Sequence, residues 1–278
     1  MNDATLREHR SRVAGALDYI QDNLAGDLSL DRLAGRAGVS PYHFHRLFKA
    51  MVGEPPKKYV RRLRLEHAAV RLKHTNRSVT GVAFEAGYET HEAFTRAFKS
   101  RFGASPRRFR SRAGGSGRAS LRARIVELPS QQIAYVRHVG PYDQASGAFD
   151  RLIAWAAQRG LLDEASVLGV YWDDQSITAP RHTRCDAALS VEAGVASEGD
   201  IRVRALPGGD YAVVRHEGRY QAQALRRIYE LVYGSWLPAI GREPADAPPF
   251  EVYRTPSQGP EFPSLVTSVH VPLAAKRA

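Results

Sequence analysis

The sequence is poor in cysteine and contains no long apolar run. Cys185 is the single cysteine among 278 residues, which excludes an intramolecular disulfide and suits a reducing compartment. No uninterrupted apolar stretch approaches the ~20 residues that a membrane-spanning helix needs. The first residues, MNDATLREHR, are charged and lack the apolar region of a secretory signal. These absences predict a cytoplasmic protein without a membrane partner.

Patterns typical of catalytic or metal sites are also missing. The adjacent Asp173 and Asp174 indicate a turn rather than an acid–base pair, because neighbouring side chains diverge. His182 and Cys185 are too few for a zinc site. The glycines at 114–117 are not followed by the GK[ST] ending of a phosphate-binding loop, and there is no G-x-S-x-G elbow. We therefore expect no catalytic residues, no metal and no cofactor.

Positive charge is concentrated in the first two-fifths of the chain. Residues 1–112 contain 22 lysines and arginines against 11 aspartates and glutamates, whereas residues 113–278 contain 18 of each. The net charge of +11 therefore belongs to the first segment, and it predicts a polyanionic partner for that segment alone. The stretch AGGSG at 113–117 is typical of a flexible linker. We expect a domain at 1–112, a linker at 113–122 and a second domain at 123–278.

Two stretches of the basic segment nearly repeat each other. FHRLFKAMVGEPP begins at Phe44, and FTRAFKSRFGASP begins at Phe94. Both copies have the apolar spacing of a helix that buries one face. The positions expected to point inward are Phe44, Leu47, Phe48 and Met51 in the first copy, and Phe94, Ala97, Phe98 and Phe102 in the second. The opposite face of each helix is polar and basic.

A shorter amphipathic helix precedes each of these helices. The first is expected at 30–37 with Ser29 as its N-cap, and the second lies within 78–87. Ser40 and Thr90 are the expected N-caps of the two longer helices. A short helix, a glycine-containing turn and a second helix with a basic outer face form the helix-turn-helix pattern. The basic segment is therefore predicted to be an all-α domain with tandem helix-turn-helix units.

The helix expected between the two units is long. It starts after Pro55, runs through KKYVRRLRLEHAAVRLKH, and has Leu65, Ala68, Ala69 and Leu72 as its apolar stripe. About 19 residues at ~1.5 Å each give about 28 Å. Successive major-groove faces on one side of a duplex are ~34 Å apart. We therefore expect the chain to place its two recognition helices in two consecutive major-groove segments of double-stranded DNA.

Residues from about Val13 to Arg110 resemble the DNA-binding domain of the AraC/XylS family of transcription regulators. The resemblance rests on LSLDRLAGRAGVSPYHFHRLFK and VTGVAFEAGYETHEAFTRAFKSRFGASPRRFR. Most members carry this domain last, whereas here it comes first, as in the Rob-like subset. The resemblance implies recognition positions at Tyr42, His45, Arg46, His91, Glu92 and Arg96, to which helical periodicity adds Lys49, Thr95 and Lys99. RNA polymerase is the candidate protein partner.

The two outward faces differ at two of four positions. Tyr42 stands against Glu92 and His45 against Thr95, whereas the arginine and the lysine are shared. Arginine reads guanine, lysine mostly holds phosphate, and glutamate accepts a hydrogen bond from cytosine. The sequence therefore predicts an operator with two unlike half-sites.

The second segment also contains a repeat. ELPSQQIAYVRHVGPYDQA from Glu127 aligns with ALPGGDYAVVRHEGRYQAQ from Ala205. Each copy predicts a strand, a glycine-containing turn and a helix, and further strand-like runs are VLGVYW, CDAALSV, FEVYR and LVTSVHV. Two such units predict a pseudo-twofold α+β domain whose antiparallel sheet packs on helices.

Residues from about Ala123 to Leu273 resemble the GyrI-like small-molecule-binding domain, on the stretches RHVGPY, GVYWDDQSITAPRHTRCDAALSV, RHEGRY and PFEVYR. In that family a glutamate of the penultimate strand helps to receive lipophilic cations, and the matching position here is Glu251. Strand alternation places Tyr253 on the same face, and aromatic faces attract cations. The expected effector-binding residues are Glu251, Tyr253, Trp172, Tyr142, Trp155, Trp236 and Phe262.

We therefore expect a DNA-binding transcription regulator, not an enzyme, that a small-molecule effector controls. Two other interpretations of the second segment stay open. Some GyrI-like proteins resemble hydrolases of small electrophilic compounds, and turnover of a bound compound would distinguish catalysis from sensing. The other alternative is a module that binds no small molecule and recruits RNA polymerase or another protein.

Overall fold

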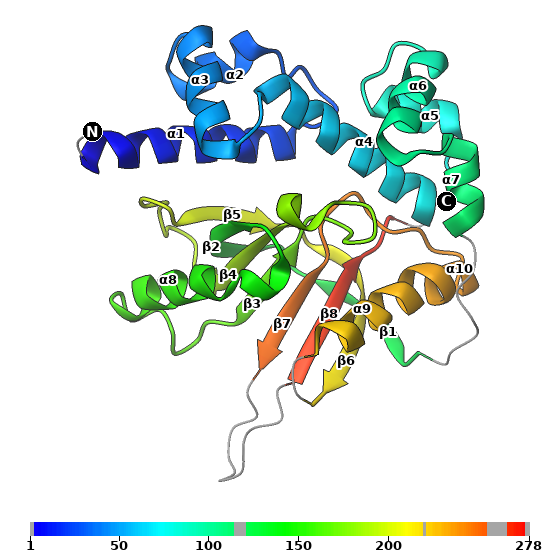
Figure 1. Ribbon diagram of the computed structural model, residues 1–278. Helices are drawn as coiled ribbons and strands as arrows, with labels where there is room; N and C mark the ends of the chain where they lie inside the picture. Colours follow the sequence, from blue (N-terminus) through cyan, green and yellow to red (C-terminus); the bar gives the residue numbers. More distant parts are fainter. Residues whose placement is uncertain (1–2, 114–120, 219–220, 255–265, 276–278) are drawn as a thin grey trace. The chain divides into compact units, whose positions relative to one another are not determined.

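The computed structural model describes residues 3–113, 121–218, 221–254 and 266–275 of the chain (Figure 1). The chain forms two units, Met1–Ala113 and Gly114–Ala278. The described elements of the first unit are all helices, and the second unit is built on a sheet, as the sequence predicted. Within these residues, no helix combines the length and the apolar character needed to cross a membrane.

The described part of the first unit contains two helix-turn-helix motifs joined by a long helix. Its helices are α1 (Asp3–Asp22), α2 (Leu30–Ala37), α3 (Pro41–Val52), α4 (Pro56–His74), α5 (Val79–Glu85), α6 (His91–Phe102) and α7 (Pro106–Ala113). The first motif is formed by α2 and α3, and the second by α5 and α6 (Figure 1). The connecting helix α4 has 19 residues, the length expected from the sequence.

The two recognition helices, α3 and α6, begin at the predicted caps. The Ser40 hydroxyl accepts a hydrogen bond from the backbone N–H of His43 at 3.3 Å, and the Thr90 hydroxyl accepts one from Ala93 at 3.2 Å. Each cap satisfies a backbone donor that the first turn of a helix leaves without a partner. Both helices end at a glycine in the left-handed conformation. Local sequence therefore sets both ends of each recognition helix.

Seven of the eight inward positions predicted for these helices are buried or half-buried. The prediction that Met51 points inward is wrong. Phe44, Phe48 and Phe94 have no exposed surface, whereas Met51 is 38% exposed. Val52, the next residue, packs against the core instead. The turn of a helix contains 3.6 residues, so after two turns the inward direction falls between i+7 and i+8. In this helix the apolar face continues to i+8.

The second unit consists of two copies of the same strand and helix order. The first copy contains β1 (Ala123–Leu128), β2 (Gln131–Val139), η1 (Tyr142–Gln144), α8 (Ser146–Ala157), β3 (Val167–Tyr171), η2 (Pro180–His182) and β4 (Arg184–Val191). The second contains β5 (Arg202–Leu206), β6 (Gly209–Glu217), α9 (Ala222–Leu231), η3 (Val232–Trp236), α10 (Leu237–Ala239), β7 (Phe250–Arg254) and β8 (Val266–Pro272). The edge strands β1 and β5 were not predicted from the sequence.

The eight strands that the structure describes form one antiparallel sheet in the order β1-β6-β8-β7-β3-β4-β2-β5. Strands β3 and β7 meet at its centre, where the two copies adjoin. The two edge strands are exchanged, because β1 of the first copy pairs with β6 of the second, and β5 of the second pairs with β2 of the first. Each copy therefore completes the sheet of the other.

One row of paired residues crosses the sheet on the face that carries α8 and α9. Directly paired residues of antiparallel strands lie on the same face. The row runs through Val214, Val269, Glu251, Gly169, Ala187 and Val136. At one end Val214 packs under α9, and at the other Val136 packs under α8. Glu251 and Gly169 therefore lie at the middle of this face, between the two helices.

Candidate functional site

The outer face of α3 presents the residues that the sequence predicted for DNA contact. Tyr42 is 72% exposed, Arg46 and Lys49 are exposed, and His45 is half-buried. The Arg46 guanidinium donates to the Tyr42 hydroxyl at 3.4 Å, and its carbon lies 5.7 Å from the centre of the Tyr42 ring. Tyr42 therefore orients the arginine one turn further along the helix.

The outer face of α6 presents the corresponding set of the second motif. His91, Glu92, Arg96 and Lys99 are exposed, and Thr95 is half-buried. The Thr95 hydroxyl lies 3.4 Å from Nε2 of His91. Both recognition helices thus expose an arginine and a lysine, and their first turns differ in charge and aromatic character.

The structure adds two basic pairs, one in each copy, that the sequence analysis did not select. Lys57 and Lys58 are exposed in the first turn of α4, and Arg107 and Arg108 are exposed in the first turn of α7. These pairs occupy matching places in GEPPKK and GASPRR, directly after each recognition helix. The repeat could have identified them, since alignment of the two copies pairs lysine with arginine twice.

A second candidate site surrounds Glu251 in the other unit. The Glu251 side chain is only 2% exposed. Its Oε1 accepts a hydrogen bond from the Tyr229 hydroxyl at 3.2 Å, and its Oε2 accepts one from the Tyr253 hydroxyl at 2.9 Å. The Tyr171 hydroxyl lies 2.6 Å from that of Tyr253. Three tyrosine hydroxyls therefore converge on one acid.

Burial dominates the acid–base properties of this cluster. Burial raises the pKa of Glu251 to about 7, and the hydroxyls of Tyr253, Tyr229 and Tyr171 act in the opposite direction by stabilising the ionised form. Burial also raises the pKa of Tyr229 well above its usual value, and the nearby Glu251 adds to the effect. Glu251 is therefore a buried carboxyl that can change its charge near neutral pH.

Aromatic rings enclose the cluster on several sides. The Phe149 ring of α8 packs edge-on against Tyr253 with 6.0 Å between ring centres, and Tyr142 packs edge-on against Tyr171 at 5.0 Å. Tyr233 stacks on Tyr229 one turn further along. Buried aromatic faces beside a carboxylate are the surroundings that favour an organic cation.

The two copies contribute different residues to this cluster, because the first copy has Gly169 where the second has Glu251. The sequence GVYW of the first copy aligns with EVYR of the second, so Gly169 corresponds to Glu251 and Tyr171 to Tyr253. A Cβ atom at Gly169 would lie 2.5 Å from the Tyr253 hydroxyl oxygen and 3.0 Å from that of Tyr171. The two symmetry-related tyrosines can therefore meet only because the first copy lacks a side chain at this position.

Trp172 lies on the other face of the sheet and does not join this cluster. It packs with the core on that face, and its indole N–H donates to Asp186 at 2.8 Å. The guanidinium carbons of Arg137 and Arg204 lie 5.1 Å and 4.7 Å from its ring centre. Adjacent residues of a strand point to opposite faces, so Tyr171 and Trp172 could not both line one site.

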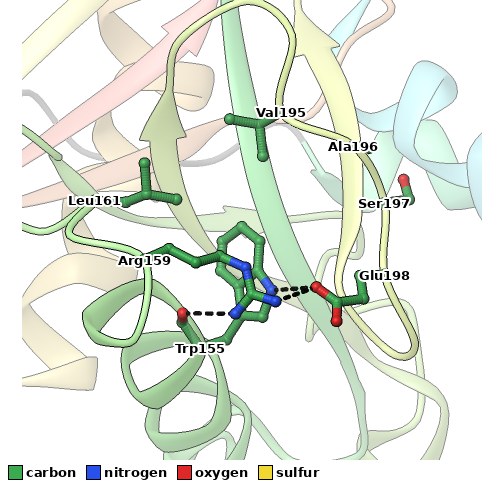
Figure 2. A pocket seen from close by; sticks show the side chains of 7 residues that line it. All are labelled: Trp155, Arg159, Leu161, Val195, Ala196, Ser197 and Glu198. Carbon is green, nitrogen blue, oxygen red and sulfur yellow. Dashed lines mark hydrogen bonds and ion pairs between the residues drawn. The ribbon is translucent and has the colours of Figure 1, made fainter.

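Trp155 lines a different pocket, which Figure 2 shows. This pocket has a volume of about 490 Å³ and is lined by Trp155, Arg159, Leu161, Val195, Ala196, Ser197 and Glu198. The Glu198 carboxylate accepts hydrogen bonds from the Trp155 indole at 3.2 Å and from Arg159. The Arg159 guanidinium covers the indole face. Trp155 is therefore not a wall of the Glu251 site.

Trp236 and Phe262 are the remaining residues predicted to bind an effector. Trp236 packs against the hydrophobic cluster beneath α9, together with Tyr229 and Tyr233. Phe262 lies outside the described residues. Of the predicted set, the structure brings Glu251, Tyr253 and Tyr142 together.

Asp173 and Cys185, which the sequence analysis did not assign to a catalytic or metal site, are held in the folded structure. Asp173 accepts hydrogen bonds from the guanidinium of Arg184 at 2.7 Å and 2.9 Å, which fixes a turn. Cys185 is buried, and burial raises the pKa of its thiol to about 12. In the part of the chain that the structure describes, no cluster of three or more histidine, cysteine or acidic side chains is placed to hold a metal ion.

Comparison with protein families gives one match in each unit. The GyrI-like small molecule binding domain matches residues 123–274, and a helix-turn-helix domain matches residues 33–112. The multiple antibiotic resistance protein MarA of Escherichia coli (strain K12) is 35% identical over 98 residues, which cover 35% of this chain and 77% of MarA. The transcriptional regulator Rob of Salmonella typhimurium is 34% identical over 123 residues, 43% of each chain.

A solved structure of a Chromobacterium violaceum transcriptional regulator with an AraC-type DNA-binding domain is also similar. It is 29% identical, covers 38% of this chain and 96% of its own, and has a TM-score of 0.36. The chain covers more than two thirds of MarA at 35% identity, and the GyrI-like match at 123–274 spans more than half of the 278 residues. The chain belongs to the AraC/XylS family of transcription regulators, in the Rob-like layout that places the helix-turn-helix domain before a GyrI-like small-molecule-binding domain.

Proposed function

We propose that this protein is a sequence-specific DNA-binding regulator whose activity responds to a lipophilic cationic effector bound at Glu251. The observation that carries the DNA-binding half is the repeated, capped recognition helix with an exposed arginine and lysine in each copy. The observation that carries the effector half is a buried carboxyl enclosed by tyrosines.

The distribution of charge supports two roles within each DNA-reading motif. Arg46 and Arg96 lie on the outward faces, where a guanidinium reaches the guanine edge in the major groove. The basic pairs at 57–58 and 107–108 stand at helix N-termini, where backbone N–H groups and positive side chains both attract phosphate. The first set is proposed to read bases and the second to hold the backbone.

The charge balance at Glu251 supports a cationic ligand. A carboxylate withdrawn from water is unfavourable unless a positive charge or hydrogen-bond donors compensate it. Here the compensation comes from tyrosine hydroxyls, which carry no charge. An organic cation would supply the missing positive charge and would be held by the aromatic faces as well, at ~0.5–2 kcal/mol for each cation–π contact.

DNA reading is tested by in vitro selection with the full chain and random duplexes. We expect a site with two unlike half-sites. In fluorescence anisotropy, Arg46→Ala and Arg96→Ala should each weaken binding by 1–3 kcal/mol, or roughly 5- to 150-fold, and each should relax specificity in a different half-site. Arg112→Ala removes an exposed charge outside the recognition helices and serves as the control. Recovery of a perfect palindrome would contradict the proposed asymmetry.

Effector binding is tested with tetraphenylphosphonium as a lipophilic cation, tetraphenylborate as its anionic counterpart and triphenylphosphine oxide as a neutral compound. All three tryptophans, Trp155, Trp172 and Trp236, lie in the second unit, so their fluorescence reports its unfolding. A ligand at a hundred times its dissociation constant stabilises the folded state by ~2.7 kcal/mol. We expect this shift with the cation alone.

Two variants locate the bound cation. Glu251→Gln keeps the shape of the side chain and removes its charge, and it should abolish the stabilisation. Glu198→Gln removes an exposed carboxylate of the same unit and should retain it. A cation that stabilises both variants equally would place binding elsewhere. A bound cation that leaves the affinity for selected DNA unchanged would contradict effector control and favour a recruitment module.

A further inference from the structure

Four charged side chains form a continuous chain through the centre of the DNA-binding unit. Glu54 lies between α3 and α4, and its Oε1 accepts hydrogen bonds from Nε and Nη2 of Arg62 at 2.8 Å and 2.7 Å. Arg62 also donates to Glu66 at 3.0 Å, one turn further along α4. The other oxygen of Glu66 accepts a hydrogen bond from Arg101 of α6 at 2.6 Å. The chain therefore connects the end of one recognition helix to the other recognition helix.

Three of the four members are withdrawn from water. Glu54 is 6% exposed, Arg62 8% and Glu66 3%. Taking charges out of water is unfavourable, and a hydrophobic replacement of the same volume is often as stable or more so. A buried ionic group of this kind is therefore better explained by the geometry that it enforces than by stability.

The two copies of the repeat differ at the ends of this chain. In the alignment of FHRLFKAMVGEPP with FTRAFKSRFGASP, Glu54 corresponds to Ala104, and Arg101 corresponds to Met51. The first copy thus offers an acid to Arg62, and the second copy offers a base to Glu66. If the two contacts were exchanged, Glu54 would meet Glu66 and Arg101 would meet Arg62, which places like charges together. Each copy therefore fits only one member of the Arg62–Glu66 pair on α4.

We propose that the chain Glu54–Arg62–Glu66–Arg101 fixes the separation of the two recognition helices and thereby selects the half-site spacing that the protein accepts. This inference rests on the proposed reading of DNA by both motifs. Arg101 is the positioning residue at the second motif, because its partner Glu66 belongs to the helix that separates the motifs.

Other contacts hold the second motif in its folded form without Arg101. Arg71 of α4 pairs with Glu85 of α5, and Arg110 of α7 donates to the carbonyl of Leu72 at 3.3 Å. Arg101 itself is part-exposed, with 32% of its side chain accessible. We therefore expect Arg101→Met, which introduces the residue found at the matching position of the first copy, to fold normally.

The experiment measures affinity as a function of operator spacing. The full chain first selects its operator, and duplexes are then made with one or two base pairs inserted or deleted between the half-sites. One inserted base pair moves a half-site by ~3.4 Å and rotates it by ~35° about the duplex axis. Because several base contacts are then misplaced, wild type should lose about 100-fold in affinity.

Arg101→Met should flatten this spacing profile, with a loss of about tenfold or less for the same insertion. Arg101→Lys keeps the charge and should restore most of the wild-type profile, whereas Arg112→Met removes a charge from α7 and should leave the profile unchanged. Circular dichroism establishes that each variant is folded.

Two results would overturn the inference in different ways. Arg101→Met with the same spacing profile as wild type, but weaker binding at every spacing, would show that Arg101 acts only through its charge or through stability. Failure of wild type to select any sequence would instead contradict the proposed reading of DNA, and the spacing inference with it.

Discussion

Tyr229 of α9 donates a hydrogen bond to Glu251 of β7, across 3.2 Å. The bond joins a helix to the central strand at the buried carboxyl, and it stabilises the ionised form of an acid that burial would otherwise keep neutral. The charge of Glu251 at a given pH therefore depends on a balance between desolvation and donated hydrogen bonds.

The stability of the second unit should depend on Glu251 between pH 4.5 and about 7. The usual pKa of 4.5 applies to the unfolded chain, whereas burial raises the pKa of Glu251 to about 7 in the folded one. The folded state thus binds the extra proton in this window, and the free energy of unfolding should fall as pH rises, by up to about 1.4 kcal/mol per pH unit.

This prediction is measured as the difference between wild type and Glu251→Gln in tryptophan-monitored unfolding. Contributions from other groups cancel in that difference, including His270, whose pKa burial lowers to about 4 and which acts in the opposite direction. A difference that is constant from pH 4.5 to 8 would show that Glu251 titrates normally.

The affinity for tetraphenylphosphonium should rise with pH through about 7, because the cation prefers the ionised carboxylate. Tyr229→Phe removes one donor and should raise the pKa of Glu251 further, so that the midpoint of this rise moves to higher pH. Glu251→Gln should give no rise. Calorimetric titration at each pH measures the midpoint, and an unchanged midpoint in Tyr229→Phe would contradict the role of its hydroxyl.

Gly169→Ala should disturb the meeting of the two tyrosines. The added Cβ would lie 2.5 Å from the Tyr253 hydroxyl, so the ring must move and its bond to Glu251 must lengthen. Overpacking of this kind typically costs 1–3 kcal/mol, and the tryptophan-monitored unfolding of the second unit should shift accordingly. Gly147→Ala in α8 meets only an ordinary contact at 3.8 Å and should be neutral or slightly stabilising.

Gly87→Ala should destabilise the first unit more than Gly103→Ala. Both glycines have a positive φ, of 75° and 70°, but only a Cβ at Gly87 would meet another group, the guanidinium of Arg64 at 2.8 Å. Strain alone should cost about 1–2 kcal/mol at either position. The excess in Gly87→Ala measures the contact.

Chemical denaturation followed by circular dichroism at 222 nm gives both values. Arg64 donates to the carbonyls of Leu24 and Gly26 at 2.9 Å and 2.6 Å, so it cannot move away without losing those bonds. Arg64→Met should therefore reduce the difference between the two alanine variants. Equal costs for both variants would mean that the arginine yields freely.

Features that depend on neighbouring residues were visible in the sequence. Ser40 and Thr90 cap the recognition helices, and the apolar stripe of α4 is buried, because capping and helical periodicity act within a few residues. Strands β2, β3, β4, β6, β7 and β8 were likewise visible as apolar runs. The choice of Glu251 as a candidate effector-binding residue came from the resemblance to the GyrI-like family.

Features that depend on strand pairing could not be predicted from the sequence. Tyr171 and Tyr253 are 82 residues apart, and they meet only because β3 pairs with β7. Tyr229 reaches the same carboxyl from a helix. Trp155 and Trp172 were predicted from residue type alone. Trp155 points from its helix toward Glu198, and strand alternation places Trp172 on the opposite face of the sheet, beside Asp186. Alignment of GVYW with EVYR would have identified Tyr171.

The exchange of β1 and β5 affects the order in which the parts of the second unit can fold. The chain leaves the ribosome from its N-terminus, and domains generally fold in that order. Strand β1 cannot pair until β6 has been made, since residue 123 pairs with residue 214. Strand β3 likewise requires β7, since residue 169 pairs with residue 251. The helices of the first unit have near neighbours and can fold while the sheet is still being made. A newly made chain can therefore complete the helices of its first unit before the tyrosines and Glu251 of the second unit have come together.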